Sequence, residues 1–149
     1  RIIRRLRTTY PNRELIFHYP QEMERSVSGT PLQQCSEPGM PVTGYTRDGV
    51  CSMHRGDEGS HHICLKNIGG QENFCSVTGQ TNWCENKDNW CVCEWAFETA
   101  VRRAGCDAFD IKCEATNQRA LDHYERRGMS HAAECIRRAC IIDTTRGIE

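Results

Sequence analysis

Eleven cysteines in a chain of 149 residues restrict how this sequence can fold more than any other feature does. Their share of the composition is just below the ~8–10% that marks a dedicated disulfide scaffold. Two interpretations stay open: disulfides in an oxidising compartment, or thiolates that bind a metal in a reducing one. No Cys-x-x-Cys pair occurs, so the usual ligand spacing of zinc sites is absent. Because the count is odd, at least one thiol stays free, binds a ligand or pairs with another chain.

The length and charge of the chain limit its class. A chain of this length fits one domain that buries a real core. The mean hydropathy is −0.68, and no apolar run approaches the ~20 residues that a membrane-spanning helix requires, so no transmembrane span is predicted. The 19 basic and 20 acidic residues nearly balance, which argues against a general nucleic-acid binder, since such proteins carry a broad basic face.

The first residues form a basic cluster. Residues 1–7 carry four arginines and no acidic residue: Arg1, Arg4, Arg5 and Arg7. The cluster is either a solvated tail or an arm that binds an acidic partner or an anionic membrane surface. The predicted organisation is a basic, extended arm in residues 1–28, a cysteine-rich globular domain in residues 29–143 and a C-terminal tail in residues 144–149.

The first half of the predicted domain is rich in loops, and a helix follows it. Glycine and proline interrupt residues 29–89 often, which favours loops with short strands such as residues 60–65. Residues 89–104 carry an apolar face at helical spacing, which includes Trp90 and Cys93. Gly105 suits the left-handed position that ends such a helix.

The second half of the predicted domain contains a strand and two helices. Apolar and polar residues alternate over residues 109–115, which predicts a half-buried strand. Helices are predicted over residues 117–127, ended by Gly128, and over residues 130–140. The sequence therefore predicts a small, loop-rich α+β domain with short strands and about three helices, stabilised by its cysteines.

Cys91 and Cys93 are the first candidates for chemistry. They lie at the start of the predicted helix, where backbone N–H groups favour a thiolate. Three interpretations stay open: a nucleophile, a metal ligand, or a structural pair with Cys93 in the core and Cys91 in a disulfide. Two residues that are two positions apart on a helix point in different directions, so a shared metal requires Cys91 to lie in the preceding loop.

A histidine-rich segment supplies further candidate ligands. His61, His62 and Cys64, with Asp57 nearby, are either metal donors or ordinary surface and hydrogen-bonded residues. The combined candidates for a zinc-type metal site are Cys51, His61, Cys91 and Cys93.

The remaining motifs point to structure and not to a reaction. Arg47, Asp48 and Gly49 are either a tight turn or the site of a buried Arg47–Asp48 ion pair that holds the loops. No Gly-x-Ser-x-Gly, phosphate loop or dinucleotide fingerprint occurs. An enzyme is therefore not favoured.

Several segments of the chain resemble the family known as domain of unknown function 2237, which occurs in bacteria and in some eukaryotes. The similar segments are Leu32–Ser36, Thr43–Cys51, Asp57–Cys64, Asp88–Cys93 and Glu114–Asn117, within residues 30–125. The motif residues are Cys35, Arg47, Asp48, Cys51, His61, Cys64, Trp90, Cys91 and Cys93. The family has no established activity, so the resemblance implies a fold and not a reaction.

The sequence departs from the family pattern at two places. Residues 71–87 replace the long connection, rich in proline and glycine, that usually precedes the Trp-Cys-x-Cys motif, and Asn117 stands where the family usually has histidine. Six cysteines have no counterpart in the motifs: Cys75, Cys84, Cys106, Cys113, Cys135 and Cys140. We expect these six to form three added disulfides, while the five matching cysteines keep an older role.

The predicted function is that of a non-catalytic accessory or interaction subunit, docked peripherally on a larger assembly of protein subunits. No cofactor is expected. The alternatives are a zinc-type metal-binding domain and a thiol-dependent enzyme that uses Cys91. The basic start, with arginine at position 1, and the range of the family predict an oxidising compartment within a eukaryotic organelle, with a plastid favoured over a mitochondrion.

Overall fold

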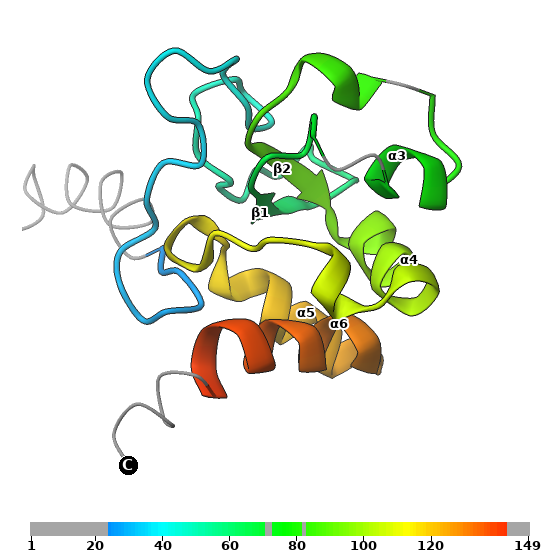
Figure 1. The fold of residues 1–149 in the computed structure, drawn as a ribbon. Helices are drawn as coiled ribbons and strands as arrows, with labels where there is room; N and C mark the ends of the chain where they lie inside the picture. The colour runs from blue at the N-terminus through cyan, green and yellow to red at the C-terminus, as the bar shows by residue number, and fades with distance from the viewer. Residues whose placement is uncertain (1–23, 71–72, 82, 143–149) are drawn as a thin grey trace, which may run out of the picture.

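A computed structural model describes residues 24–70, 73–81 and 83–142 of the chain (Figure 1). Two strands and four α-helices occur in these ranges, so the predicted α+β class is confirmed. The strands are β1 (His61–Leu65) and β2 (Trp90–Cys93). The helices are α3 (Asn73–Val77), α4 (Glu94–Ala104), α5 (Gln118–Arg127) and α6 (Ser130–Ile136). Short 3₁₀ turns cover Trp83–Asn86, Cys106–Ala108 and Cys113–Ala115, and a π-helical segment covers Arg137–Ile142.

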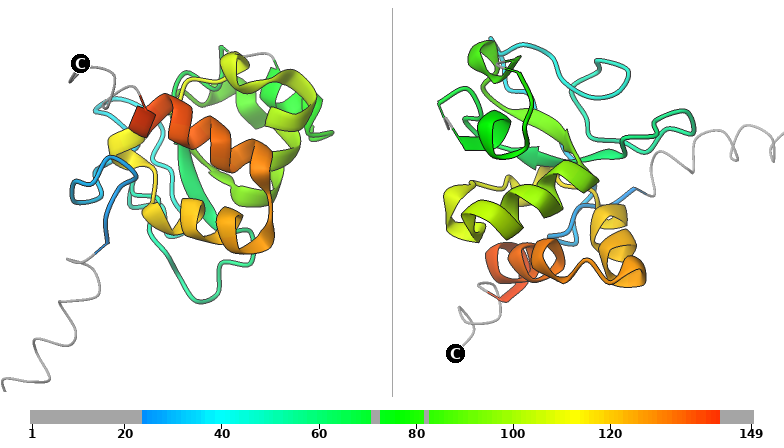
Figure 2. Two further views of the ribbon diagram at one scale, coloured as in Figure 1. Left: turned by 90° about the horizontal axis from the view of Figure 1, so that it is seen from below. Right: turned by 90° about the vertical axis from the view of Figure 1, so that its right-hand side faces the viewer.

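The two strands form an antiparallel pair at the centre of the domain. Cys64 lies opposite Cys91, and Leu65 lies opposite Trp90. A β-bulge interrupts the register between His61 and Ile63. Helix α4 contacts both strands as well as α3 and α6, and α5 contacts β1 and α6. Figures 1 and 2 show α5 and α6 side by side at one end of the molecule and the loops of residues 36–50 at the other.

The predicted helix over residues 89–104 begins later than expected, because its first residues form β2. Trp90–Cys93 pairs with β1, and only Glu94–Ala104 is helical. Cys93 has extended backbone angles and occupies the N-cap position of α4. Gly105 has a φ of 90° at the end of this helix, a value that glycine adopts without strain.

The predicted strand over residues 109–115 is wrong. Within it Ile111 makes one isolated bridge to Leu65, and Cys113–Ala115 is a 3₁₀ turn. The alternation in this segment nevertheless reflects burial, because Phe109, Ile111 and Ala115 are buried. The segment thus lies along the core without forming a ladder.

The two C-terminal helices follow the predicted boundaries closely at their starts. The side chain of Asn117 caps α5 by accepting a hydrogen bond from the Arg119 N–H (3.0 Å), and Gly128 ends this helix in the left-handed conformation. Helix α6 begins at Ser130 as expected. It changes to a π-helical segment after Ile136, so the predicted α-helix to residue 140 is too long.

Two groups of buried residues form the interior. The larger is an apolar core built from β1, β2 and the helices, with Phe74, Phe97 and Tyr124 among its fully buried side chains. The smaller consists of four cysteines and one alanine: Cys35, Cys51, Cys64, Cys91 and Ala115. The loops of the first half of the domain therefore pack mainly against buried cysteine side chains and not against large apolar side chains.

The arginine cluster of residues 1–7 lies outside the described residues. From residue 24 onward the chain packs against the domain. The Val27 N–H donates to the Thr116 carbonyl (2.9 Å), and Val27 is buried in the apolar core. Among the described helices, none has both the length and the apolar character that crossing a membrane requires.

Candidate functional site

Five disulfides join ten of the eleven cysteines. Cys35–Cys64 and Cys51–Cys91 connect the first loops to the two facing strands, and the bonded pairs lie side by side because Cys64 and Cys91 are cross-strand neighbours. The other three bridges join the six cysteines outside the family motifs to one another: Cys75–Cys84, Cys106–Cys135 and Cys113–Cys140. Cys93 is left as the free thiol.

The bridges remove the predicted metal site. Cys51 and Cys91 are bonded to each other, and a disulfide sulfur is not a thiolate ligand. The same holds for Cys35 and Cys64. His61 is occupied as well, because its ring nitrogen Nδ1 lies 2.7 Å from Asp57 Oδ1. The predicted set of Cys51, His61, Cys91 and Cys93 therefore does not form a metal site in this bonded state.

The free thiol of Cys93 is poorly activated. Burial is the largest influence and raises the pKa of this thiol. Hydrogen bonds from the Ala96 and Trp95 N–H groups lower it, and the charges of Glu94 and Asp57 raise it again, so that the pKa stays above its ordinary value. The alternative of a thiol enzyme that uses Cys91 is not supported by this arrangement, because Cys91 is bridged and Cys93 is protonated near neutral pH.

Alkylation should reveal this raised pKa directly. With a raised pKa the reactive thiolate appears only as the pH rises further, so Cys93 in the folded, oxidised chain should react several-fold more slowly with iodoacetamide at pH 8 than the same residue in denaturant. The rate should increase with pH around a higher midpoint than in the denatured chain. The denatured, unreduced chain is its own control, because Cys93 remains its single thiol. An equal or lower midpoint in the folded chain would contradict the prediction.

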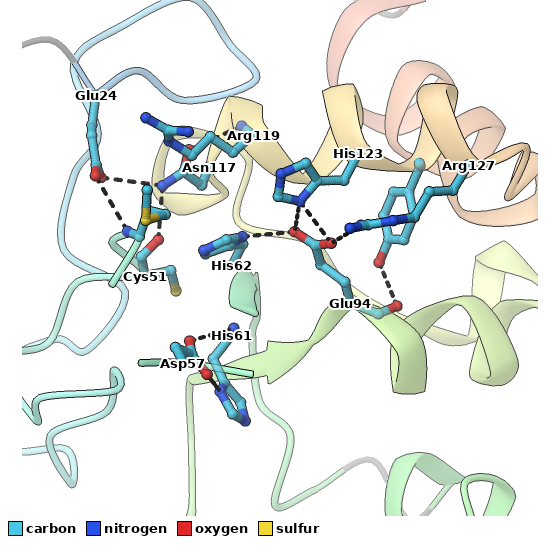
Figure 3. Close-up of polar contacts among 12 residues, drawn as sticks. Glu24, Cys51, Asp57, His61, His62, Glu94, Asn117, Arg119, His123 and Arg127 are labelled. Atoms are coloured by element: carbon cyan, nitrogen blue, oxygen red, sulfur yellow. Dashed lines mark hydrogen bonds and ion pairs between the residues drawn. The ribbon is translucent and has the colours of Figure 1, made fainter. Parts of the chain in front are cut away.

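A buried carboxylate cluster lies on the inner side of β1 (Figure 3). Glu94, the first residue of α4, has 0% exposure. Its Oε2 lies 2.6 Å from His62 Nδ1 and 3.0 Å from His123 Nδ1, and Arg127 reaches Oε1 at 3.8 Å. Because a carboxylate only accepts hydrogen bonds, each Nδ1 carries the proton in this arrangement. The Tyr124 hydroxyl donates to the backbone carbonyl of Glu94 (2.7 Å). We name His62, Glu94 and His123 the His–Glu–His cluster.

Two adjacent histidines of β1 serve different sites. Successive side chains of a strand point to opposite faces, and here His62 turns to the interior while the His61 side chain is partly exposed. His61 instead closes a turn with Asp57, which accepts from the His61 backbone N–H (2.8 Å) and from its ring. Burial raises the pKa of Asp57, but these hydrogen bonds outweigh it and lower the pKa below its ordinary value.

Sequence reasoning missed two members of the His–Glu–His cluster. Glu94 lies in the first turn of a helix, where an acidic residue is ordinarily an exposed partner of the helix dipole. His123 lies among charged residues of α5, and nothing in its neighbourhood marks it as facing inward. The adjacent pair of His61 and His62 was a usable signal, but it did not identify which ring faces the interior.

The loop from Thr43 to Cys51 is a structural element. The Gly49 N–H donates to the Thr43 carbonyl (2.7 Å), and the Cys91 N–H donates to Thr43 Oγ1 (2.9 Å), which ties the loop to β2. Arg47 is exposed, donates to the Gly44 carbonyl (2.6 Å) and lies 5.3 Å from the centre of the Trp90 ring. The alternative of a buried Arg47–Asp48 ion pair is therefore wrong, and the turn is the correct interpretation.

A polar cavity of about 660 Å³ lies between residues 24–25, residues 48–54 and the first turns of α5. Its ionisable lining residues are Glu24, Arg25, Asp48, His54, Arg119 and Asp122. Asn117 closes its inner end, because its Nδ2 donates to Glu24 Oε1 (3.2 Å) and to the Cys51 carbonyl (3.0 Å). Together with the hydrogen bond that caps α5, the side-chain amide of Asn117 makes three hydrogen bonds. A histidine, the residue that the family usually has at this position, can make only two through its ring nitrogens.

Comparison with known proteins identifies a family and corrects the predicted location. Residues 25–133 match the family described as an uncharacterised protein conserved in bacteria, DUF2237. The predicted organellar location, with a plastid favoured over a mitochondrion, is wrong, because a family conserved in bacteria does not fit it. No curated protein matches the chain. Since the match covers more than half of its length, the chain belongs to the DUF2237 family.

Proposed function

We propose that the protein is a non-catalytic binding domain, an accessory subunit that holds a charged, extended segment of a partner protein in the cavity beside α5. The observation that carries this proposal is the pairing of opposite charges in a preformed cavity. A volume of about 660 Å³ lies within the range of ligand-binding pockets. Arg119 lines it from one side, and Asp48 and Asp122 line it as well.

The charged side chains of the cavity differ in how many hydrogen bonds they make within the protein. Glu24 accepts hydrogen bonds from Asn117 and from the Met53 N–H, so its carboxylate holds the walls together. Asp48 and Asp122 each accept one bond through Oδ1, from the Val50 N–H and from Gln118, which leaves their second oxygens for a ligand. The exposed guanidinium of Arg119 makes no hydrogen bond or ion pair with the described residues. These groups suit a ligand that carries both signs of charge.

The rim of the cavity favours a protein partner over a small metabolite. Small-molecule sites are predominantly apolar and enclosed, whereas this cavity is lined mainly by polar side chains and is open to solvent. Met53 lines it with 38% of its surface exposed, and Tyr45, at 46% exposure, packs against His54 of the lining with ring centres 5.7 Å apart. Tyrosine, methionine and arginine are enriched in protein–protein interfaces.

The disulfides support a binding role by fixing the walls before a partner arrives. Cys51–Cys91 joins the wall of residues 48–54 to β2, and the hydrogen bonds of Asn117 join it to α5. Prior ordering of a site reduces the entropy that binding would otherwise lose. Five disulfides are also typical of proteins in an oxidising environment.

A peptide selection tests the proposal. The folded, oxidised chain is screened against a random octapeptide library, and the enriched peptides are expected to contain both an acidic and a basic residue. The Arg119→Glu variant should lose the preference for the acidic residue and gain one for a second basic residue, because the charge of that wall is reversed.

Arg126→Glu is the matched control. Arg126 is exposed on the same helix and lies outside the cavity lining, so this variant has the same net charge as Arg119→Glu and should enrich the same peptides as the unmodified chain. If no peptide is enriched, or if both variants enrich the same peptides as the unmodified chain, this cavity does not bind a peptide segment.

A further inference from the structure

We propose that the His–Glu–His cluster is a binding site for one divalent transition-metal ion of the zinc type, with His62 Nδ1, the Glu94 carboxylate and His123 Nδ1 as ligands. The three side chains come from β1, α4 and α5, and one donor atom of each lies within 4.8 Å of the others. Figure 3 shows both imidazole rings directed at the same carboxylate.

The donor set matches the chemistry of zinc. Two imidazoles and one carboxylate are a common three-ligand set for this ion, with a fourth position left for water. Calcium and magnesium prefer ligand sets made of oxygen atoms, so the two nitrogens select against them. The site differs from the predicted one in all its ligands and uses no sulfur.

The two distances between imidazole and carboxylate require only a small movement on binding. Zinc bonds of about 2.0–2.1 Å in a tetrahedron place two donor atoms roughly 3.3 Å apart. The present separations are 2.6 Å between His62 Nδ1 and Glu94 Oε2 and 3.0 Å between His123 Nδ1 and the same oxygen. An opening of a few tenths of an ångström at these two contacts, with the proton of each neutral ring moved from Nδ1 to Nε2, therefore frees both nitrogens to bind an ion together with the carboxylate.

The His62 ring is buried and is positioned by the nitrogen that would bind the ion. Its side chain is 2% exposed, and its Nε2 is buried without a hydrogen-bond partner among the described residues. Among the described residues the ring is therefore held through Nδ1 alone, the nitrogen that faces Glu94. A bound ion would take the place of the hydrogen bond at Nδ1 and hold the buried ring by the same nitrogen.

Arg127 distinguishes a metal site from a purely ionic cluster. Its guanidinium lies 3.8 Å from Glu94 Oε1 and is 45% exposed. In an ionic cluster it stabilises the carboxylate, and in a metal site it repels the ion. The Arg127→Gln variant therefore separates the two interpretations, because only a metal site gains affinity for a cation when this charge is removed.

The experiment titrates ZnCl₂ into the full, oxidised chain against a chromogenic chelator, in a Cys93→Ser background so that the free thiol does not contribute. We expect one zinc ion per chain, with Mg²⁺ failing to compete. The His123→Ala variant should bind on the order of 100-fold more weakly, and Arg127→Gln should bind several-fold more tightly. The absorption of bound Co²⁺ should indicate tetrahedral coordination by nitrogen and oxygen.

His131→Ala is the matched control. His131 Nδ1 lies 3.2 Å from Glu98 Oε2 in a single His–Glu pair, so its loss should leave zinc affinity unchanged. Zinc well below one per chain, or equal affinity in the His123→Ala and His131→Ala variants, would overturn the proposal. If His123→Ala does not fold, an Arg127→Gln variant that binds zinc no more tightly than the parent overturns it instead. The cavity beside α5 has none of these ligands in its lining, so failure here leaves its peptide test unaffected.

Discussion

Full reduction of the five disulfides is expected to unfold the domain at room temperature. In the chain-entropy account a bridge that closes a loop of ~15 residues contributes about 3 kcal/mol, and whole domains are stable by only ~5–15 kcal/mol. A two-stranded sheet is marginal on its own, and the first loops pack on the buried cysteine cluster instead of a hydrocarbon core. Far-UV circular dichroism and urea unfolding, with and without reductant, measure the effect.

The individual bridges should differ in a predictable order. The Cys51–Cys91 bridge spans 40 residues and Cys75–Cys84 spans 9, for which the chain-entropy account gives about 4 and about 2.6 kcal/mol. The double variant Cys51→Ala/Cys91→Ala should therefore lose more free energy of unfolding than Cys75→Ala/Cys84→Ala, and it also empties part of the buried cysteine cluster. The Cys93→Ser variant, which breaks no bridge, is the control. An unchanged urea midpoint after reduction would show that the bridges are not what holds this fold.

The Glu94→Ala substitution should reduce the free energy of unfolding by about 3–5 kcal/mol, measured in EDTA so that no metal contributes. The carboxylate is fully buried and accepts hydrogen bonds from His62 and His123. Its removal leaves two inward-facing imidazoles without their acceptor, and an unpaired buried polar group is strongly unfavourable. The cavity left by the missing side chain adds to the loss.

An exposed ion pair of the same residue type provides the comparison. Glu125 lies 2.6 Å from Arg137, with both side chains exposed, so Glu125→Ala should change stability by at most about 1 kcal/mol. Glu94→Gln keeps the shape of the side chain and separates the effect of charge from that of volume. Equal losses for Glu94→Ala and Glu125→Ala would mean that the His–Glu–His cluster does not stabilise the fold.

The features that were predictable from sequence are those that depend on local chemistry. The sequence marks both ends of helix α5, with the capping residue Asn117 at its start and Gly128 at its end. Both residues determine the helix boundary through contacts with residues nearby in the sequence. The short strand β1 was expected at residues 60–65 and occupies His61–Leu65. The high cysteine content pointed to disulfides, and the fold is indeed stabilised by them.

The features that were missed depend on contacts between distant segments. Strand β2 has four residues, too few for a period of two to be distinguished from the start of the following helix. Which cysteines join each other is not readable from spacing, because Cys64 and Cys91 become neighbours only when the strands pair. In the sequence Glu94 resembles a solvated residue, and its burial is made tolerable by partners from distant segments, the rings of His62 and His123 and the guanidinium of Arg127.

The order of the five bridges along the chain divides the described residues into two covalently closed blocks. Cys35–Cys64 and Cys51–Cys91 interlock and enclose Cys75–Cys84, whereas Cys106–Cys135 and Cys113–Cys140 interlock separately. No bridge spans residues 92–105, the stretch that contains α4. A backbone cut inside either block leaves one covalent molecule, but a cut within α4 leaves two pieces held only by noncovalent contacts. The disulfides of each block can therefore form without any cysteine of the other block. Helix α4 is the only covalent connection between the two blocks.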